Sequence, residues 1–488
     1  MIATVDFGTT VTKVAVWADD GLVTVARAEL TTTRAEIGWA EQEPFSWWTS
    51  MVVACAEARA AAPEAFDAVV VLACSGARQT FVPVTSSAEP QGRGILWSDR
   101  RAGDEARALA ESLGGEAAVR TRTGVPLDAG AVAAKIAWLA EHEPARLAAS
   151  DWLLSPRDLV VWRLTGEVAT DTTQASRTGL YDLDGQVVDG LAGAAAGRLP
   201  PVVPPDTVVG TLRAVPAAQL GLPPGIPVVI GAGDRACEVL GTGATDRRPM
   251  VSWGTTGNVS VPSDTRPAAV PTGAVLSRSA AGGWLVEAGL SSAGSFLGWL
   301  GRLVGDEGPA LLAAAATSPP GARGVVAVPW LDGARAPWWR DTARAAFVGL
   351  SAAHEVGDLA RAVVESVAWE AARALEAVTG PAGADGLSLA GAGAGLELWV
   401  TVLTAVTGLP ARRRRSGEAA SAGAALLGAR ATGRRLDLEA LDPLTDEFAP
   451  DPEAVACYAS LRPLAEAVAG TLVDLPTAAS RPAQAEVG

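Results

Sequence analysis

The chain has 488 residues, of which 49% are hydrophobic and 19% charged, and it carries a formal net charge of −15 with a sequence pI near 4.8. An acidic surface repels nucleic acid and anionic membranes, which argues against both as partners and favours a small-molecule ligand. The length predicts two or more domains with enough apolar residues to fill their cores.

Cysteines and histidines are too few and too dispersed to carry the chemistry. Four cysteines show no C-x-x-C spacing, and the two histidines lie near none of them. This pattern disfavours structural zinc, a disulfide framework and Ser-His-Asp or Cys-His catalysis, so we expect carboxylates to be the catalytic groups. The longest uncharged stretch, Ala214 to Gly233, is interrupted by prolines, and no apolar leader precedes the first strand. We therefore expect a cytoplasmic protein.

The chain begins with a predicted phosphate-binding hairpin. Ile2 to Val5 reads as a strand, Gly8-Thr9-Thr10 as a turn, and Val14 to Trp17 as the returning strand. Glycine lets backbone N–H groups approach an anion, and threonine adds hydroxyl donors. Lys13 is one of only two lysines against 37 arginines. A lysine kept in such a background suggests a site that needs one compact ammonium.

Residues 1–245 continue as an α/β pattern. Val69 to Cys74 reads as a buried strand and Ala131 to Glu141 as a helix. The strand Ile226 to Ile230 leads into Gly231-Ala232-Gly233-Asp234, which satisfies a dinucleotide-binding G-x-G-x-x-A pattern. We interpret that match as accidental, because an aspartate inside the phosphate turn would repel pyrophosphate.

The second half, residues 246–450, repeats the hairpin signature. Val5, Gly8, Thr9 and Thr10 recur as Val251, Gly254, Thr255 and Thr256, all 246 positions later, which suggests duplicated halves. Later segments, in order, are predicted as a long helix near 355–378, a glycine loop at 390–395, a solvated arginine loop at 412–415, a C-terminal helix at 451–476 and a disordered tail at 477–488.

Two familiar nucleotide-binding motifs are absent. A Walker A loop requires a Gly-Lys pair, but the two lysines follow Thr12 and Ala134. The protein-kinase motifs H-R-D and D-F-G are also missing. The chain instead resembles the FGGY carbohydrate kinases, whose fold is similar to that of actin and hexokinase. Besides both hairpins and the glycine loop, the matching segments are 38–48, 97–101, 164–171 and 233–234.

This resemblance implies two ribonuclease H-like, actin-like ATPase domains of the α/β class with a cleft between them. It also implies ATP and Mg²⁺ as cofactors and a small sugar or polyol as acceptor. Both hairpins would meet the phosphates, Asp6 would hold Mg²⁺ through water, and Asp234 would be the general base. The phosphate-binding residues would be Gly8, Thr9, Thr10, Lys13, Gly254, Thr255 and Thr256; the adenine loop Gly391, Gly393 and Gly395; and the sugar-binding residues Arg78, Gln79, Trp97 and Asp99, together with Asp234.

The preferred acceptor is a ketopentose such as xylulose, because the pattern leans toward xylulose kinases. Glycerol or another polyol is the alternative, because the run Ala175-Ser176-Arg177-Thr178 leans toward glycerol kinases and Arg78-Gln79 fits neither group cleanly. Ala334 replaces a glutamate that the family pattern leads us to expect. Arg235 also stands where many relatives carry a neutral residue. A chaperone-like or filament-forming ATPase without a sugar acceptor is the rival of another class, and a sugar-sensing repressor is disfavoured by the acidic charge. A homodimer is left open.

Overall fold

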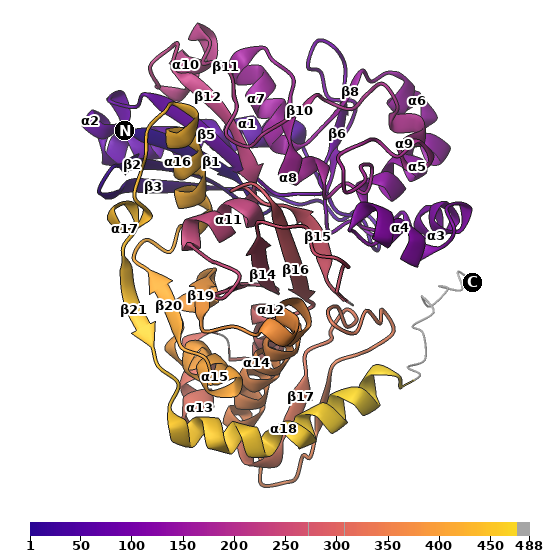
Figure 1. The fold of residues 1–488 in the computed structure, drawn as a ribbon, viewed down its shortest axis with the longest axis vertical. Coiled ribbons are helices and arrows are strands. Elements are labelled where there is room, and N and C mark those ends of the chain that lie inside the picture. The colour runs from indigo at the N-terminus through magenta and orange to yellow at the C-terminus, as the bar shows by residue number, and fades with distance from the viewer. Residues whose placement is uncertain (272, 307, 476–488) are drawn as a thin grey trace.

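Two β-sheets, one from each half of the chain, organise the computed structural model, which describes residues 1–271, 273–306 and 308–475 (Figure 1). The first sheet has the strand order β11 (Val208–Thr211), β12 (Pro227–Gly233), β5 (Val71–Gly76), β1 (Ile2–Phe7), β2 (Val11–Ala18), β3 (Gly21–Glu29). The second has the order β15 (Val275–Arg278), β16 (Trp284–Leu290), β14 (Gly257–Ser263), β13 (Met250–Trp253), β19 (Leu387–Ala390), β20 (Ala411–Arg414), β21 (Leu444–Phe448).

The two sheets share one strand arrangement. Strand β1 pairs antiparallel with β2 and parallel with β5. In the same way, β13 pairs antiparallel with β14 and parallel with β19. Each sheet therefore places a hairpin beside parallel strands, as expected from the repeated sequence signature. The mixed α/β class and the duplicated, actin-like plan predicted from the sequence are confirmed.

Helices bury both faces of the first sheet. Alternate side chains of β1 point to opposite faces, so Ala3, Val5 and Phe7 pack with α1 (Pro44–Ala61) and α7 (Pro156–Thr165). The other face packs against α11 (Asp234–Thr242) and α16 (Ala419–Ala431). Helix α16 belongs to the second half by sequence, so the two halves are interleaved (Figure 1).

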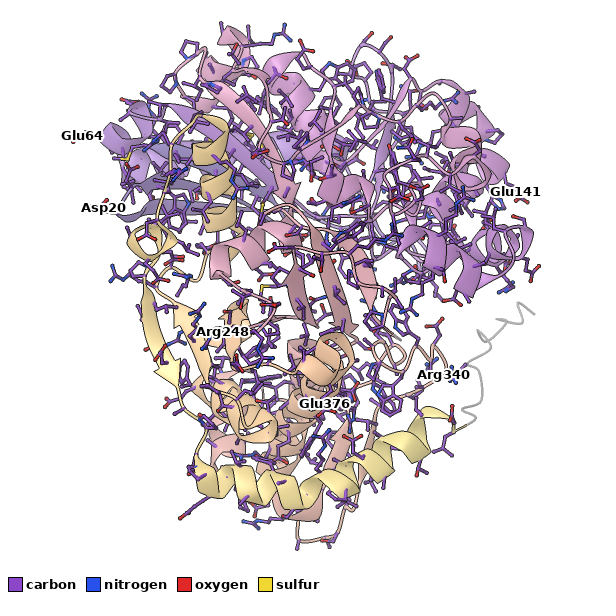
Figure 2. The ribbon with its side chains drawn as sticks, viewed as in Figure 1. Asp20, Glu64, Glu141, Arg248, Arg340 and Glu376 are labelled. Atoms are coloured by element: carbon purple, nitrogen blue, oxygen red, sulfur yellow. The ribbon has the colours of Figure 1, made fainter. Side chains whose placement is uncertain are left out.

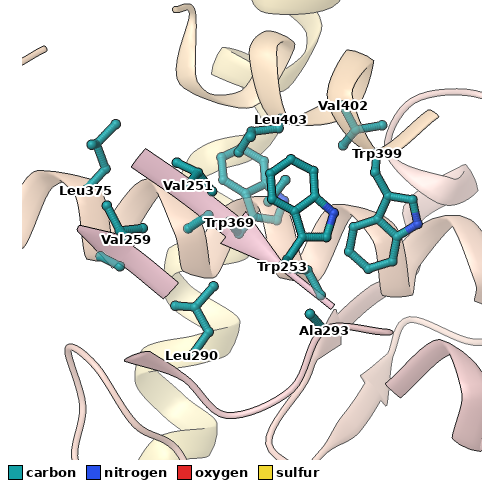
Figure 3. Close-up of a cluster of buried hydrophobic side chains, with 14 of the residues drawn as sticks. Val251, Trp253, Val259, Leu290, Ala293, Trp369, Leu375, Trp399, Val402 and Leu403 are labelled. Carbon is teal, nitrogen blue, oxygen red and sulfur yellow. The ribbon is translucent and has the colours of Figure 1, made fainter. Parts of the chain in front are cut away.

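The second sheet is covered mainly by α14 (Val356–Thr379), which matches the long helix predicted at 355–378. Its core includes Trp253, Trp369 and Trp399, and Figure 3 shows Trp253 and Trp399 side by side, near Leu403. The rings of Trp253 and Trp399 have centroids 6.5 Å apart. Other helices of this half are α12 (Gly294–Val304), α13 (Pro309–Thr317), α15 (Glu397–Thr407), α17 (Leu438–Leu441) and α18 (Pro452–Val473).

A helical region extends the first half on one side, around its own buried cluster (Figure 1). Its helices are α3 (Gly103–Ser112), α4 (Glu116–Thr123), α5 (Val132–His142), α6 (Pro144–Ala148) and α9 (Asp189–Ala192). The helix predicted at Ala131 to Glu141 corresponds to α5, and the strands predicted near 69–74 and 226–230 correspond to β5 and β12. Short elements complete this half: α2 (Pro63–Asp67), α8 (Thr172–Ala175), α10 (Ala214–Leu220), β4 (Glu41–Gln42), β6 (Val82–Val84), β7 (Gly94–Ile95), β8 (Trp152–Leu154), β9 (Thr170–Asp171) and β10 (Val202–Val203).

The arginine run, apart from the exposed Arg415, is not the solvated loop that the sequence predicts. Strand β20 includes Arg412 to Arg414, and the Arg414 side chain is buried, donating to the carbonyl oxygens of Thr242 and Asp442. Arg413 instead donates to the carbonyl oxygen of Ala394. The prediction was wrong because a run of like charges does not reveal carbonyl acceptors supplied by distant segments.

Acidic residues such as Asp20, Glu64 and Glu141 are exposed and lie at the periphery of the first half (Figure 2). Among the described helices, none combines the length and the apolar character needed to cross a bilayer. The C-terminal helix predicted at 451–476 corresponds to α18, whereas the tail predicted at 477–488 lies outside the described residues.

Candidate active site

A cleft of about 1610 Å³ is lined by residues from both halves of the chain. It gathers the turns of both hairpins, the end of β1, the start of α11 and the glycine loop after β19. The site residues expected from the sequence that line it are Asp6, Thr9, Thr10, Lys13, Trp97, Asp234, Gly254, Thr255, Thr256, Gly391 and Gly395.

Both hairpin turns line the cleft, and each is tightly closed. In the first turn, a Cβ on Gly8 would lie 2.7 Å from the carbonyl oxygen of Val11, so only glycine fits there. In the second, the Gly254 N–H donates to the carbonyl oxygen of Thr256 over 2.9 Å, and the carbonyl of Gly254 accepts from Gly294 at the start of α12. The turn at 254–256 is thus fixed to a helix.

Two carboxylates lie at the carboxyl edge of the first sheet. Asp6 is near the end of β1 and Asp234 follows β12 directly, and the two strands flank β5 in parallel. Burial, together with the negative charge of Asp234, raises the pKa of Asp6 to about 6. The Ser75 hydroxyl donates to Asp6 over 2.5 Å. The charge of Asp234 thus disfavours ionisation of Asp6, and carboxylate oxygens of this kind are the ligands that a hard divalent cation prefers.

Asp234 is the more accessible of the two acids. Its side chain is 41% exposed, and it begins α11 with one carboxylate oxygen accepting the backbone N–H of Arg235 over 2.7 Å. The guanidinium Nε of Arg78 lies 3.6 Å from the same oxygen. Arg235 itself turns to Glu238 on the next turn of the helix. Asp234 lines the cleft, and among the described residues none hydrogen-bonds to its other carboxylate oxygen.

Lys13 lines the cleft but is already paired. Its ammonium lies 3.0 Å from a carboxylate oxygen of Glu418, which precedes α16 and also binds Arg27. The side chain of Lys13 is 33% exposed and lines the cleft. Glu418 was missed at the sequence level because it lies 405 residues from Lys13.

The residues predicted to bind a sugar are split in the structure. Trp97 lines the cleft, and its indole N–H donates to the hydroxyl of Thr9 over 2.8 Å. Arg78 is buried and forms two hydrogen bonds with Glu287 on β16. Gln79 accepts from Arg177. The structure thus brings Trp97 to the cleft wall and places the other two behind it.

Asp99 is fully buried and does not line the cleft. Its carboxylate accepts four hydrogen bonds, one from the backbone N–H of Ala40, one from the backbone N–H of Arg101 and two from the Arg101 guanidinium, so both oxygens are already engaged and are not left for a sugar hydroxyl. This geometry makes Asp99 an anchor of its loop. A sequence pattern places an acid near a site but does not show which way its oxygens turn.

The glycine loop packs on Trp253 of β13. A Cβ on Gly393 would lie 2.0 Å from indole atoms of Trp253, and one on Gly391 would lie 2.6 Å from the carbonyl oxygen of Trp253. Gly391 also has a left-handed φ of 79°. Gly395, by contrast, has open space where its Cβ would stand, and it faces the cleft. Glu287 and Arg177, which do not line the cleft but bind Arg78 and Gln79, were missed at the sequence level. A lone charge within an apolar strand is the signal that could have identified Glu287.

This arrangement, with paired hairpins, a glycine loop and two carboxylates in one cleft between duplicated halves, is that of a phosphotransferase. The sequence matches the family model "FGGY family of carbohydrate kinases, N-terminal domain" over residues 1–241, and the corresponding C-terminal domain model over residues 250–432. The chain therefore belongs to the FGGY family of carbohydrate kinases, and it is a carbohydrate kinase acting on a sugar or polyol.

Two relatives of similar identity carry different names. A xylulose kinase of Klebsiella pneumoniae is 31% identical over 472 residues, which cover 94% of this chain and 96% of that protein. A glycerol kinase of Cereibacter sphaeroides strain KD131 is 30% identical over 474 residues, covering 92% and 93%. Among solved structures, a xylulose kinase from Rhodospirillum rubrum superposes with a TM-score of 0.85 at 29% identity, covering 96% of this chain and 98% of that one.

Proposed function

We propose that this kinase transfers the γ-phosphoryl group of ATP to a hydroxyl of a ketopentose such as xylulose. The observation that carries the proposal is the convergence of both threonine turns with Asp6 and Asp234 in one cleft. The relative named xylulose kinase supports the choice of acceptor, and the glycerol kinase of similar identity makes glycerol or another polyol the second candidate.

Asp234 acts as the general base in this proposal. A carboxylate oxygen of Asp234 accepts the proton of the sugar hydroxyl, the resulting oxygen forms a bond to the γ-phosphorus, and the bond to the β-phosphate oxygen breaks to release ADP. The guanidinium of Arg78, 3.6 Å away, holds the Asp234 carboxylate in place.

The remaining groups align and neutralise the triphosphate. Thr9, Thr10 and Lys13 would bind it from the first half, with Thr255 and Thr256 opposite them; the nucleotide base would lie toward Gly391 and Gly395. Asp6 fits the role of a Mg²⁺ holder, and a bound Mg²⁺ would supply charge neutralisation for the phosphates. Trp97 would present an apolar face to the sugar's C–H groups.

An ADP-release assay with D-xylulose, D-ribulose, glycerol and a no-acceptor control tests the proposal. We expect the ketopentoses to stimulate ADP release above the control, with kcat/KM highest for D-xylulose. A higher kcat/KM for glycerol would identify glycerol instead of a ketopentose as the acceptor and would leave the proposed phosphoryl transfer unchanged. ADP release that no acceptor changes would instead favour an ATPase without a sugar substrate.

A further inference from the structure

The second lysine of the chain, Lys135, has no part in the chemistry above, yet it is buried and hydrogen-bonded. Lys135 lies on α5, and its side chain is completely buried. Its ammonium donates to the carbonyl oxygens of Gln79 and Leu96, each over 2.8 Å. Among the residues that the structure describes, no carboxylate bonds to it.

This position is costly for a cation. Burial lowers the pKa of Lys135 to about 7; the nearby positive charges of Arg100 and Arg101 add to this lowering, and the negative charges of Asp99 and Asp128 oppose it. An unpaired buried ammonium destabilises a fold unless hydrogen bonds compensate it. The compensation comes from two carbonyl groups that belong to different loops, so the ammonium acts as a bridge between them.

The first carbonyl belongs to a strained residue. Gln79 has a φ of 59°, the left-handed region that residues other than glycine rarely adopt. Its carbonyl oxygen is turned to Lys135 and its side chain to Arg177, while the preceding residue, Arg78, reaches Asp234 and Glu287. Holding Gln79 in this conformation therefore sets the direction of Arg78 toward the proposed base.

The second carbonyl fixes the cleft wall. Leu96 immediately precedes Trp97, whose backbone N–H donates to the hydroxyl of Thr80 over 3.1 Å. The indole N–H of Trp97 in turn donates to Thr9 in the first phosphate turn. One ammonium thus joins the loop that carries Arg78 to the loop that carries Trp97.

We propose that Lys135 is a positioning residue that holds the loops 77–80 and 96–99 in the arrangement that binds the sugar. The proposal rests on the proposed function, because the sugar is placed against these loops. Lys135 contacts neither substrate: it acts through the backbone of Gln79 and Leu96.

The test compares Lys135→Met with Arg198→Met. Methionine keeps the length and apolar stem of lysine but has no N–H to donate. Arg198 is a matched control, since it also donates to two backbone carbonyls, those of Ser150 and Ala194, away from the cleft. For each variant we would measure KM for D-xylulose, D-ribulose and glycerol, KM for ATP, ATP hydrolysis without acceptor, and backbone hydrogen exchange in segments 77–80 and 96–99.

We expect Lys135→Met to raise KM for the acceptor about tenfold or more, while KM for ATP and acceptor-free hydrolysis stay within about twofold. Exchange in both segments should become faster in this variant and stay unchanged in Arg198→Met. Unchanged exchange in both segments, or an unchanged acceptor KM in a folded variant, would overturn the role of Lys135. If Lys135→Met does not fold, Lys135→Leu, which also has no N–H to donate and has a shorter apolar side chain, is measured for the same quantities and judged by the same outcomes.

The two proposals fail in different ways. If the wild-type protein phosphorylates none of the three acceptors, the proposed function is wrong. The exchange comparison still decides whether Lys135 holds the two loops, because it needs no substrate.

Discussion

Arg78 and Glu287 form a buried, two-pronged ion pair that joins the two halves of the molecule. Their nitrogen and oxygen atoms lie 2.7 and 2.8 Å apart, although the residues are 209 positions apart in the sequence. Arg78 follows β5 of the first sheet and Glu287 lies within β16 of the second. The same arginine reaches toward Asp234, so the pair links the contact between the halves to the proposed base.

We predict that Glu287→Gln destabilises the protein by about 3–5 kcal/mol, because it leaves the Arg78 guanidinium buried without its counter-charge. Urea unfolding at pH 7 measures this loss. The double variant Arg78→Met/Glu287→Met should be less destabilised than the sum of its two single variants. Additive effects would show that the two side chains do not stabilise each other.

The same pair predicts a pH dependence at acid pH. Burial opposes ionisation of Glu287, but the charges of Arg78 and Arg177 outweigh it and lower its pKa from 4.5 to about 2. A lowered pKa means that the stabilisation is fully present above pH 4.5 and is lost as the pH falls from 4.5 toward 2. As the pH is lowered from 4.5 toward 2, the unfolding free energy should therefore decrease more steeply in the wild type than in Glu287→Gln.

The contribution of Asp6 to stability should depend on pH in the opposite direction, because its ionised carboxylate serves the proposed function but destabilises the fold. Burial and the charge of Asp234 raise its pKa from 3.8 to about 6, so ionised Asp6 destabilises the fold above pH 6. Asp6→Asn should therefore be more stable than the wild type at neutral pH, by up to about 3 kcal/mol, with the difference shrinking between pH 6 and pH 4. Its kcat should fall at least about 100-fold. Equal stability of Asp6→Asn and the wild type at pH 7 would contradict the destabilising effect of ionised Asp6. Normal turnover of the variant would exclude Asp6 from the proposed active site.

Local patterns were sufficient to predict much of this site. Turn chemistry identified the segments at 8–10 and 254–256, and strand patterns placed Asp6 and Asp234 at strand ends. Parallel strands bring such ends to one edge, so the predicted residues meet without further information. The glycine loop was also recognised, but two of its glycines are needed to pack on Trp253, which no local pattern indicates.

Long-range partners could not be predicted from the sequence. The burial of Asp99, the pairing of Lys13 with Glu418 and the burial of Arg414 all depend on which distant segments pack together. The sequence does not show whether a charged residue binds a ligand, a carbonyl group or another charged side chain. The structure therefore changes the roles expected of individual charged residues more than it changes the fold.

Asp234→Asn tests the proposed general base. The amide cannot accept the proton of the sugar hydroxyl, so kcat should fall by about 10²–10⁴ while the melting temperature and the affinity for ATP stay close to those of the wild type. Asp246→Asn, at an exposed position after α11, is the control and should leave kcat unchanged. Steady-state kinetics with D-xylulose, together with calorimetric titration of ATP, separates the two effects. A kcat within about threefold of the wild type would exclude Asp234 as the base.

Gly393→Ala tests the support beneath the proposed adenine loop. The added methyl group would stand 2.0 Å from the indole of Trp253, which is itself packed against Trp399, so either the loop or the core must shift. We expect a loss of about 1–3 kcal/mol in unfolding free energy, as in other overpacked cores, and a rise in KM for ATP that exceeds any change in KM for the sugar. Gly395→Ala is the matched stability control, because its methyl group would meet no atom within 4 Å. Its melting temperature should equal that of the wild type. If Gly393→Ala is as stable as Gly395→Ala, the contact between the loop and Trp253 does not hold the loop in place.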